Sequence, residues 1–212
     1  MERAIPKENG EEDRIILNLL SSVEDGATSQ RRIAAELGIA LGLVNAYLKR
    51  CVKKGLVKVS EAPARRYAYY LTPKGFNEKS RLTVEYLSSS FHFFRQAKAD
   101  CARVFEVAKV RNFQNLVLRG RSDLAEIAIL TAVERDIAIV AVVDPGAEPG
   151  LFVGKDLVHA FSDIRTPFDA VVVTDVGNAR GSFDEAVKVY GSHCVLAPTL
   201  LGLNSVRSRQ GE

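Results

Sequence analysis

Apolar residues in the first part of the chain recur at the spacing of helices that bury one side. The pattern predicts three helices in succession. Thr28 or Ser29 can cap the second helix, because a hydroxyl there accepts a backbone N–H, and Gly38 suits its C-terminal end. The three predicted helices cover residues 11–24, 30–37 and 41–55.

A predicted hairpin follows these helices. Residues 56–60 alternate between apolar and polar side chains, and residues 66–71 are rich in tyrosine. Both runs favour strands, and residues 61–65 between them form the tip. Three helices followed by a hairpin are typical of a winged helix-turn-helix, in which the third helix is the recognition helix.

A long helix is predicted next. Thr72-Pro-Lys-Gly75 can start it, and no proline or glycine occurs from residue 79 to residue 110. The pattern allows one break. An apolar stripe along this helix predicts the seam of a homodimer, and the alternative is that the stripe packs on the protein's own domains. The stripe consists of Leu87, Phe91, Phe94, Cys101 and Phe105.

The second half alternates short apolar runs with helical patterns. Strands are predicted at 116–118, 137–143, 170–173 and 194–196, and helices at 122–135 and 183–190. The segment after residue 143 is predicted to be a loop. Because the strands are apolar on both sides, the sequence predicts a parallel sheet covered on both faces by helices, as in Rossmann-like α/β folds.

Charge separates the two halves. The net charge is +3, but residues 28–82 hold 12 basic and three acidic residues, and residues 111–212 carry a net charge of −3. A basic block of this kind favours a polyanionic partner. We therefore expect three parts: a winged helix-turn-helix DNA-binding domain (1–83), a linker and dimerisation helix (84–112), and a Rossmann-like ligand-sensing domain (113–212).

Several classes of protein are excluded by composition. No apolar stretch is long enough to cross a membrane, and the N-terminus has no signal-peptide pattern. The three cysteines, Cys51, Cys101 and Cys194, are scattered, which fits neither a disulfide framework nor a zinc site. We expect a cytoplasmic protein without a metal centre.

The predicted recognition helix carries residues suited to the major groove. Leu41 and Gly42 permit close approach, Asn45 can pair with an adenine edge, and Lys49 and Arg50 lie at phosphate reach. Basic residues at the start of the second helix and at the hairpin tip extend this surface toward the backbone and the minor groove. These additional DNA-binding candidates are Arg31, Arg32, Arg65 and Arg66.

Three motifs resemble the MarR-like winged-helix regulators, in particular the subgroup associated with exopolysaccharide gene clusters. They are Ser29-Gln-Arg-Arg-Ile-Ala-Ala-Glu-Leu-Gly38, Leu41-Gly-Leu-Val-Asn45 and Leu71-Thr-Pro-Lys-Gly75. The resemblance covers about residues 14–94 and implies operator binding by a dimer. This chain has Ala40, Leu43 and Ala46 where the subgroup has Ser, Lys and Tyr, which implies altered specificity. The alternative is a winged helix that binds another protein.

A degenerate dinucleotide-binding motif lies between the first strand and helix of the second half. Gly120, Ser122 and Ala125 occupy its three positions, and Asp144 ends the next strand, where an acidic residue meets ribose hydroxyls. A glycine-rich loop follows strand 170–173. Because ligands bind at the carboxyl ends of parallel strands, we expect one crevice formed by Gly120, Arg121, Ser122, Asp123, Asp144, Thr174, Asp175, Asn178 and Arg180.

Residues 115–201 resemble two Rossmann-like groups through Gly120-Arg-Ser-Asp-Leu-Ala125, Val142-Val-Asp144 and Phe168-Asp-Ala-Val-Val-Val173. These are the sensing domain of Rex-type redox repressors and the small nucleotide-binding domain before sugar acyltransferases. The resemblance implies a nucleotide ligand. Since Ser122 replaces a glycine that admits a pyrophosphate, we expect a nucleotide or nucleotide-sugar rather than NAD(H). A domain that only dimerises remains the alternative.

Together these observations predict a transcription regulator that binds double-stranded DNA as a homodimer and responds to a small-molecule nucleotide effector. A Rex-like repressor that responds to NAD(H) is the alternative ligand assignment. We expect no enzyme, because about 100 residues leave no room for a substrate domain and no Ser/His/Asp or Cys/His set is visible. The rival from another class is a small nucleotide-binding enzyme whose winged helix serves protein interaction.

Overall fold

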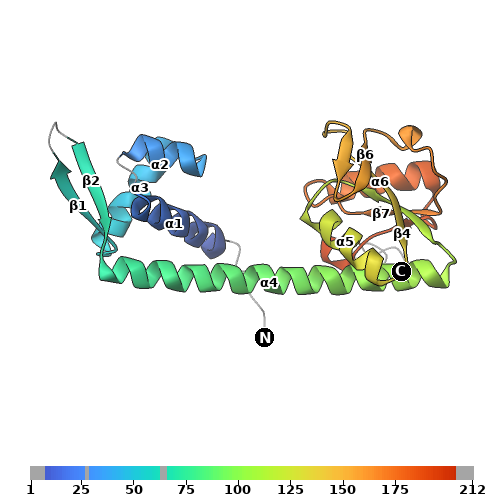
Figure 1. Cartoon of the computed structure of the whole chain (residues 1–212), viewed down its shortest axis with the longest axis horizontal. Helices are drawn as coiled ribbons and strands as arrows, with labels where there is room; N and C mark the ends of the chain where they lie inside the picture. The colour runs from blue at the N-terminus through green and yellow to red at the C-terminus, as the bar shows by residue number, and fades with distance from the viewer. Residues whose placement is uncertain (1–7, 27–28, 63–65, 204–212) are drawn as a thin grey trace, which may run out of the picture. The chain divides into compact units, whose positions relative to one another are not determined.

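The computed structural model describes residues 8–26, 29–62 and 66–203. The chain divides into two compact units, residues 1–90 and 91–212, so that the division falls within helix α4 (Pro73–Val110). Figure 1 shows the elements of both units.

The first unit contains three helices, a two-stranded antiparallel sheet and the first part of α4. Its local signals act as the sequence predicts. The Ser29 hydroxyl accepts the Arg32 backbone N–H at 3.2 Å, and Gly38 ends the following helix with a φ of 65°. The elements are α1 (Glu8–Glu24), α2 (Gln30–Leu37), α3 (Leu41–Lys53), β1 (Val57–Ala62) and β2 (Arg66–Leu71).

One apolar core holds this unit together. Leu19, Leu20, Ile33 and Val44 are fully buried in it, and Leu82 of α4 joins them. Burial of each such side chain contributes roughly 2 kcal/mol. The winged helix-turn-helix therefore includes the beginning of α4.

The Thr72-Pro-Lys-Gly75 motif attaches α4 to the hairpin. The Thr72 hydroxyl donates to the Gly55 carbonyl at 2.7 Å and accepts the Gly75 N–H at 3.0 Å. Pro73 is the first helical residue, where a missing N–H costs nothing. A Cβ on Gly75 would collide with the Leu56 carbonyl group, so glycine is required at this close approach.

The second unit is an α/β domain with a six-stranded sheet in the order β5-β6-β4-β3-β7-β8. All neighbours are parallel except β5 and β6. Its elements after α4 are β3 (Asn115–Arg119), α5 (Asp123–Glu134), β4 (Ala138–Val143), β5 (Gly150–Phe152), β6 (Lys155–Val158), η1 (Phe161–Asp163), β7 (Ala170–Val173), α6 (Ala179–Tyr190), β8 (Val195–Leu196) and η2 (Thr199–Leu201).

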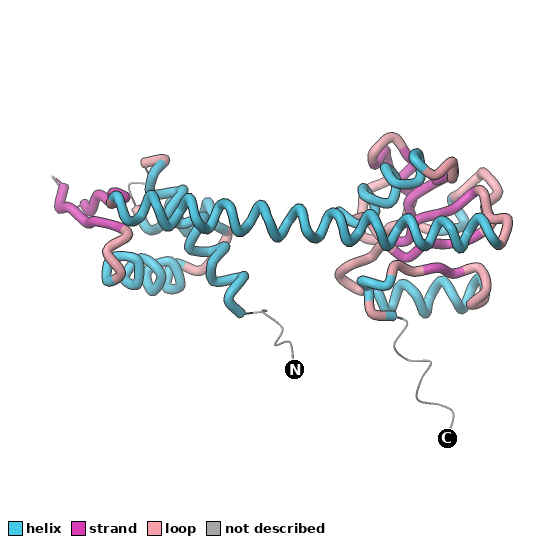
Figure 2. The backbone as a smooth tube through the Cα atoms, turned by 90° about the horizontal axis from the view of Figure 1, so that it is seen from below, coloured by secondary structure: helices cyan, strands magenta, loops and turns pink. Residues whose placement is uncertain are grey.

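Both faces of this sheet are covered, as predicted. Val172 of β7 faces the core formed with α4 and α5, whereas Val171 and Val173 face α6. Figure 2 shows the strands of this domain in magenta among its helices in cyan. Alternation along a strand explains why a run of valines packs into two separate cores.

The long helix is continuous, without the break that its pattern allowed. Three sequence predictions need correction. The loop predicted after residue 143 contains the β5–β6 hairpin. Cys101 and Phe105, predicted to lie in the dimer seam, are buried in the α/β domain's own core. Cys194 precedes β8 and is only half-buried, because the strand begins one residue later.

Within the described residues, no helix is both long enough and apolar enough to cross a bilayer.

Candidate nucleic-acid interface and ligand site

Helix α3 presents an open face on the side away from the core. Val44, Leu48 and Cys51 are buried against α1, α2 and the hairpin. Helical geometry places Gly42, Ala46, Lys49 and Lys53 opposite these residues, with Leu43 and Arg50 along one edge and Asn45 along the other. All of these are exposed except Asn45, which is half-buried. Of the predicted α3 residues, Gly42 and Lys49 therefore lie on this open face, Arg50 and Asn45 lie along its two edges, and Leu41 is exposed at the start of the helix.

Arg50 is engaged within the domain. Its guanidinium pairs with the Glu12 carboxylate of α1 and lies 5.2 Å from the centre of the Tyr47 ring. The ion pair ties the guanidinium to α1, and the Tyr47 ring of α3 supports it from Arg50's own helix. A phosphate at this position must therefore compete with Glu12 for the guanidinium.

Arg32 is engaged in a similar way, whereas Arg31 is not. Arg32 Nε lies 2.7 Å from Glu36 Oε1, and the buried Ser22 hydroxyl also donates to Glu36. The hydrogen bonds from Ser22 and Arg32 lower the pKa of Glu36. Arg31 is exposed, and its side chain has no partner among the described residues.

The hairpin adds exposed polar and aromatic side chains. Lys58, Tyr67 and Tyr70 are exposed on β1 and β2. Arg66 begins β2, where only its backbone is described, and Arg65 lies outside the described residues.

In the α/β domain, β3 lies between β4 and β7, so the chain leaves the carboxyl end of β3 and that of β7 at neighbouring positions. The two turns touch at Gly120, which has a φ of 104°. A Cβ on Gly120 would lie 2.5 Å from Asp175 Cα and 2.6 Å from Asp175 N. Glycine is thus required at the first position of the motif, because a side chain there would collide with the turn after β7.

Thr174 and Ser122 join the two turns by hydrogen bonds. The buried Thr174 hydroxyl donates to the Gly120 carbonyl at 2.7 Å. The Ser122 hydroxyl donates to the Thr174 carbonyl at 2.6 Å and accepts the Ala125 N–H at 3.2 Å, which caps α5. Both hydroxyls therefore point into the domain.

The Asp144 side chain also accepts hydrogen bonds from the backbone of its own domain. Its carboxylate accepts the Arg121 N–H at 2.9 Å and the Gly146 N–H at 2.9 Å. The sequence predicted that this carboxylate meets ribose hydroxyls. Each oxygen has accepted one hydrogen bond, which leaves one lone pair on each for a further donor.

Asp175 is held more completely. Its carboxylate accepts the Asn178 N–H at 2.8 Å and the Ser182 hydroxyl at 2.6 Å. Burial opposes ionisation, but these hydrogen bonds and the nearby Arg119 charge outweigh it and lower the pKa of Asp175. A carboxylate charged at neutral pH therefore lies beside the turn after β3.

The remaining predicted residues differ in how free they are. Arg121 and Asp123 are exposed, and no described residue bonds to either side chain. Arg180 pairs with Asp184 one turn along α6 at 3.0 Å. The Asn178 side chain packs against Gly181 and makes no capping hydrogen bond.

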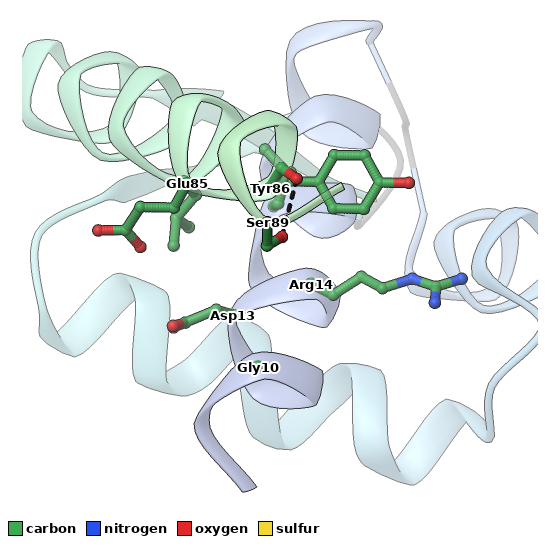
Figure 3. Close-up of a pocket in the computed structure, with 8 residues that line it drawn as sticks. Gly10, Asp13, Arg14, Glu85, Tyr86 and Ser89 are labelled. Carbon is green, nitrogen blue, oxygen red and sulfur yellow. Dashed lines mark hydrogen bonds between the residues drawn. The ribbon is translucent and has the colours of Figure 1, made fainter. Parts of the chain in front are cut away.

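Sequence reasoning missed two features. The buried Arg119 at the end of β3 pairs with Glu185 of α6 at 2.7 Å. A groove of about 190 Å³ lies between α1 and α4 in the first unit. Figure 3 shows Arg14 and Tyr86 reaching to one side of this groove and Asp13 and Glu85 to the other. Both depend on pairs distant in sequence, which periodicity does not reveal.

Comparison with known families supports the winged helix-turn-helix. Residues 13–58 match the family described as winged helix-turn-helix DNA-binding. This match covers α2 and α3 entirely, including the exposed face described above. The chain therefore contains a winged helix-turn-helix DNA-binding domain. No curated protein matches the chain.

Among solved structures, matches include an O-methyltransferase, NcsB1 from neocarzinostatin biosynthesis, in complex with S-adenosyl-L-homocysteine. It is 13% identical, with a TM-score of 0.36, and the alignment covers 89% of this chain and 82% of that one. Human N-acetylserotonin methyltransferase in complex with SAM is 12% identical, with a TM-score of 0.28 and coverage of 82% and 72%. PigF with SAH is 13% identical, with a TM-score of 0.28 and coverage of 78% and 62%.

These matches contradict the prediction that the chain is not an enzyme, because methyltransferases are enzymes. The prediction was wrong to exclude catalysis. It rested on the lack of room for a substrate domain and on missing nucleophile sets, and transfer between two bound molecules needs positioning rather than a protein nucleophile. At these TM-scores the likeness assigns no activity to the chain.

Proposed function

We propose that the chain is a DNA-binding transcription regulator in which α3 enters the major groove and the β1–β2 hairpin lies along the adjacent backbone. The observation that carries the proposal is the open face of α3, with its cations. When such cations contact DNA phosphates, the counterions condensed on the DNA are released, and the affinity therefore depends on salt. Arg31, Lys49, Lys53 and Lys58 are exposed and pair with no described carboxylate.

Two copies bind a two-fold symmetric operator in this proposal. The exposed apolar side chains of α4 that support pairing are Val84, Leu87, Phe91 and Phe94, with exposed fractions of 41–62%. They recur every three or four residues and so lie along one side of the helix. A second copy buries these four apolar side chains. Cys101 and Phe105 do not take part, because they are already buried in the core of the α/β domain.

The α/β domain binds a nucleotide or nucleotide-sugar in this proposal, at the turns after β3 and β7. Arg121 provides an unpaired guanidinium for a phosphate, and Asp144 retains lone pairs for ribose hydroxyls. The Asp175 carboxylate beside Gly120 repels a pyrophosphate placed on the first turn. A smaller phosphate group shifted toward Arg121 avoids this repulsion, which supports the choice against NAD(H).

The DNA part is tested by gel shift and anisotropy with the full chain. Lys49→Ala should weaken binding to every DNA sequence and reduce the dependence of affinity on salt by about one ion. Lys155→Ala, on β6 of the α/β domain, removes the same charge and provides the control. Absence of DNA binding by the wild type at low salt would overturn the proposal.

The ligand part is tested by calorimetry with uridine and cytidine nucleotides, their sugar conjugates, NADH and S-adenosylmethionine. Arg121→Ala should weaken binding of the nucleotide by tenfold or more, because a charge-assisted hydrogen bond is lost. Arg165→Ala, at another exposed site of the same domain, should have no effect. Tight binding of NADH alone would contradict our choice of ligand.

Regulation requires coupling between the two sites. If the nucleotide changes the affinity for DNA by some factor, DNA changes the affinity for the nucleotide by the same factor. Measuring both affinities with and without the other partner checks this equality. Independence of the two affinities would leave a DNA-binding protein that the nucleotide does not regulate.

A further inference from the structure

The DNA-facing surface of α3 is poor in hydrogen-bonding groups in its first two turns. Leu41 is 43% exposed and Leu43 is 41% exposed, and Gly42 and Ala46 are also exposed. Asn45, with a half-buried side chain, is the polar residue among positions 41–46. The charged residues of the helix, from Lys49 onward, lie in its later turns.

The N-terminus of α3 lacks a side-chain cap as well. Ala40 occupies the capping position and makes no side-chain hydrogen bond. In the second helix of a helix-turn-helix, residues of the N-terminal turns reach base edges, while later residues meet phosphate. The part of α3 that reaches the bases is therefore mostly apolar.

Apolar side chains can distinguish only one group in the major groove. Each base pair presents donors and acceptors there, and the C5 methyl group of thymine is the single apolar contact. Gly42 and Ala46 are small, so the helix backbone can approach the groove floor closely. Leu43 lies one turn before Ala46, on the neighbouring stripe of the helix.

We propose that Leu43 and Ala46 read thymine methyl groups, so that the preferred DNA site contains thymines at the positions facing these two residues. This inference rests on the proposed DNA binding and specifies its target. Lysine or tyrosine at these positions would instead seek hydrogen-bond acceptors. Contact with a methyl group also removes Leu43 from water, where 41% of it is otherwise exposed.

The test begins with selection of a preferred DNA duplex by the full chain from a random library. Each thymine of the selected site is then replaced by deoxyuridine, which keeps the base pair and lacks only the methyl group. Wild-type affinity should fall roughly three- to fivefold for each contacted methyl. Sites that lack thymine, or equal affinity for both duplexes, would overturn the inference and leave DNA binding itself intact.

A variant assigns the effect to α3. For the thymine that faces Leu43, Leu43→Ala should bring the ratio of the affinities for the thymine and deoxyuridine duplexes close to one. The affinity of this variant for the deoxyuridine duplex should stay nearly unchanged. Val52→Ala truncates another exposed apolar side chain near the C-terminal end of the same helix and should keep the wild-type ratio. If Leu43→Ala keeps the wild-type ratio, the methyl contact is made by another residue and the inference is overturned. No DNA binding at low salt would overturn the proposed function with it.

Discussion

On α3, Leu41, Gly42 and Lys49 are exposed, and the Lys49 ammonium pairs with no described residue. At the ends of β3 and β7, in contrast, the hydroxyls of Ser122 and Thr174 donate to the domain's own backbone. Both sets of residues were predicted to contact a partner. On a surface that is proposed to meet DNA, part of the polar side chains stays free. A turn between a strand and a helix must first satisfy its own backbone groups, and polar residues there serve the fold before any ligand.

Both regions also hold free and paired charged residues. The cations of the winged helix divide into free ones, such as Lys49, and paired ones, such as Arg50 with Glu12. In the α/β domain the unpaired cation nearest the sequence motif is Arg121. Partner binding in each domain is therefore expected to depend on the few unpaired cations, and the paired cations modulate the affinity for the partner.

The largest expected effect is on the α/β domain. Gly120→Ala places a Cβ against Asp175 at a φ of 104° and should destabilise this domain by about 3 kcal/mol. Burial raises the pKa of the Cys51 thiol to about 11 and that of Cys101 to about 12, so both alkylate slowly until their domain unfolds. Alkylation in increasing urea, assigned by mass spectrometry, should shift to lower urea for Cys101 and not for Cys51.

Gly150→Ala is the control for this change, since a Cβ there meets no atom within 4 Å. Equal shifts of both cysteines in Gly120→Ala would contradict the expectation that the two compact units unfold separately.

A smaller effect is expected on DNA affinity. Glu12→Gln removes the carboxylate that holds Arg50 and should strengthen binding about two- to fivefold at low salt, because the guanidinium becomes free for phosphate. Glu11→Gln removes the same charge from a neighbouring exposed position and separates pairing from net charge. Anisotropy titrations in parallel give the comparison. Identical gains in the two variants would show that Arg50 makes no phosphate contact.

The smallest effect is a pH dependence of the α/β domain. Because the pKa of Asp175 is lowered in the folded chain, the charged carboxylate stabilises the domain at pH values above the usual pKa of an aspartate. This stabilisation is lost as pH falls through about 4 toward the lowered value, since the unfolded chain takes up the proton first. Asp175→Asn should flatten the dependence measured by circular dichroism in urea from pH 6 to 3. Asp156→Asn on β6 is the control, and an unchanged slope in Asp175→Asn would contradict this role.

Elements with strong local signals were predicted closely. The bounds of α2 agree with the prediction at both ends, because a capping serine and a glycine in the left-handed conformation mark them. Strand β7 also agrees, since a continuous apolar run suits a strand buried on both faces. The β5–β6 hairpin was missed because its strands are only three and four residues long, and β6 is held in the sheet by pairing with β4.

The sequence by itself determined the succession of helices and strands apart from the β5–β6 hairpin, the winged helix-turn-helix and the basic character of its surface. These follow from periodicity, caps and charge, which act over a few residues. Only the tertiary structure decided that Arg50 is paired with Glu12, that Asp175 lies against Gly120, and that Cys101 belongs to a core. Each of these depends on residues distant in the chain, and their free energy arises from packing and hydrogen bonds that exist only once the elements have come together.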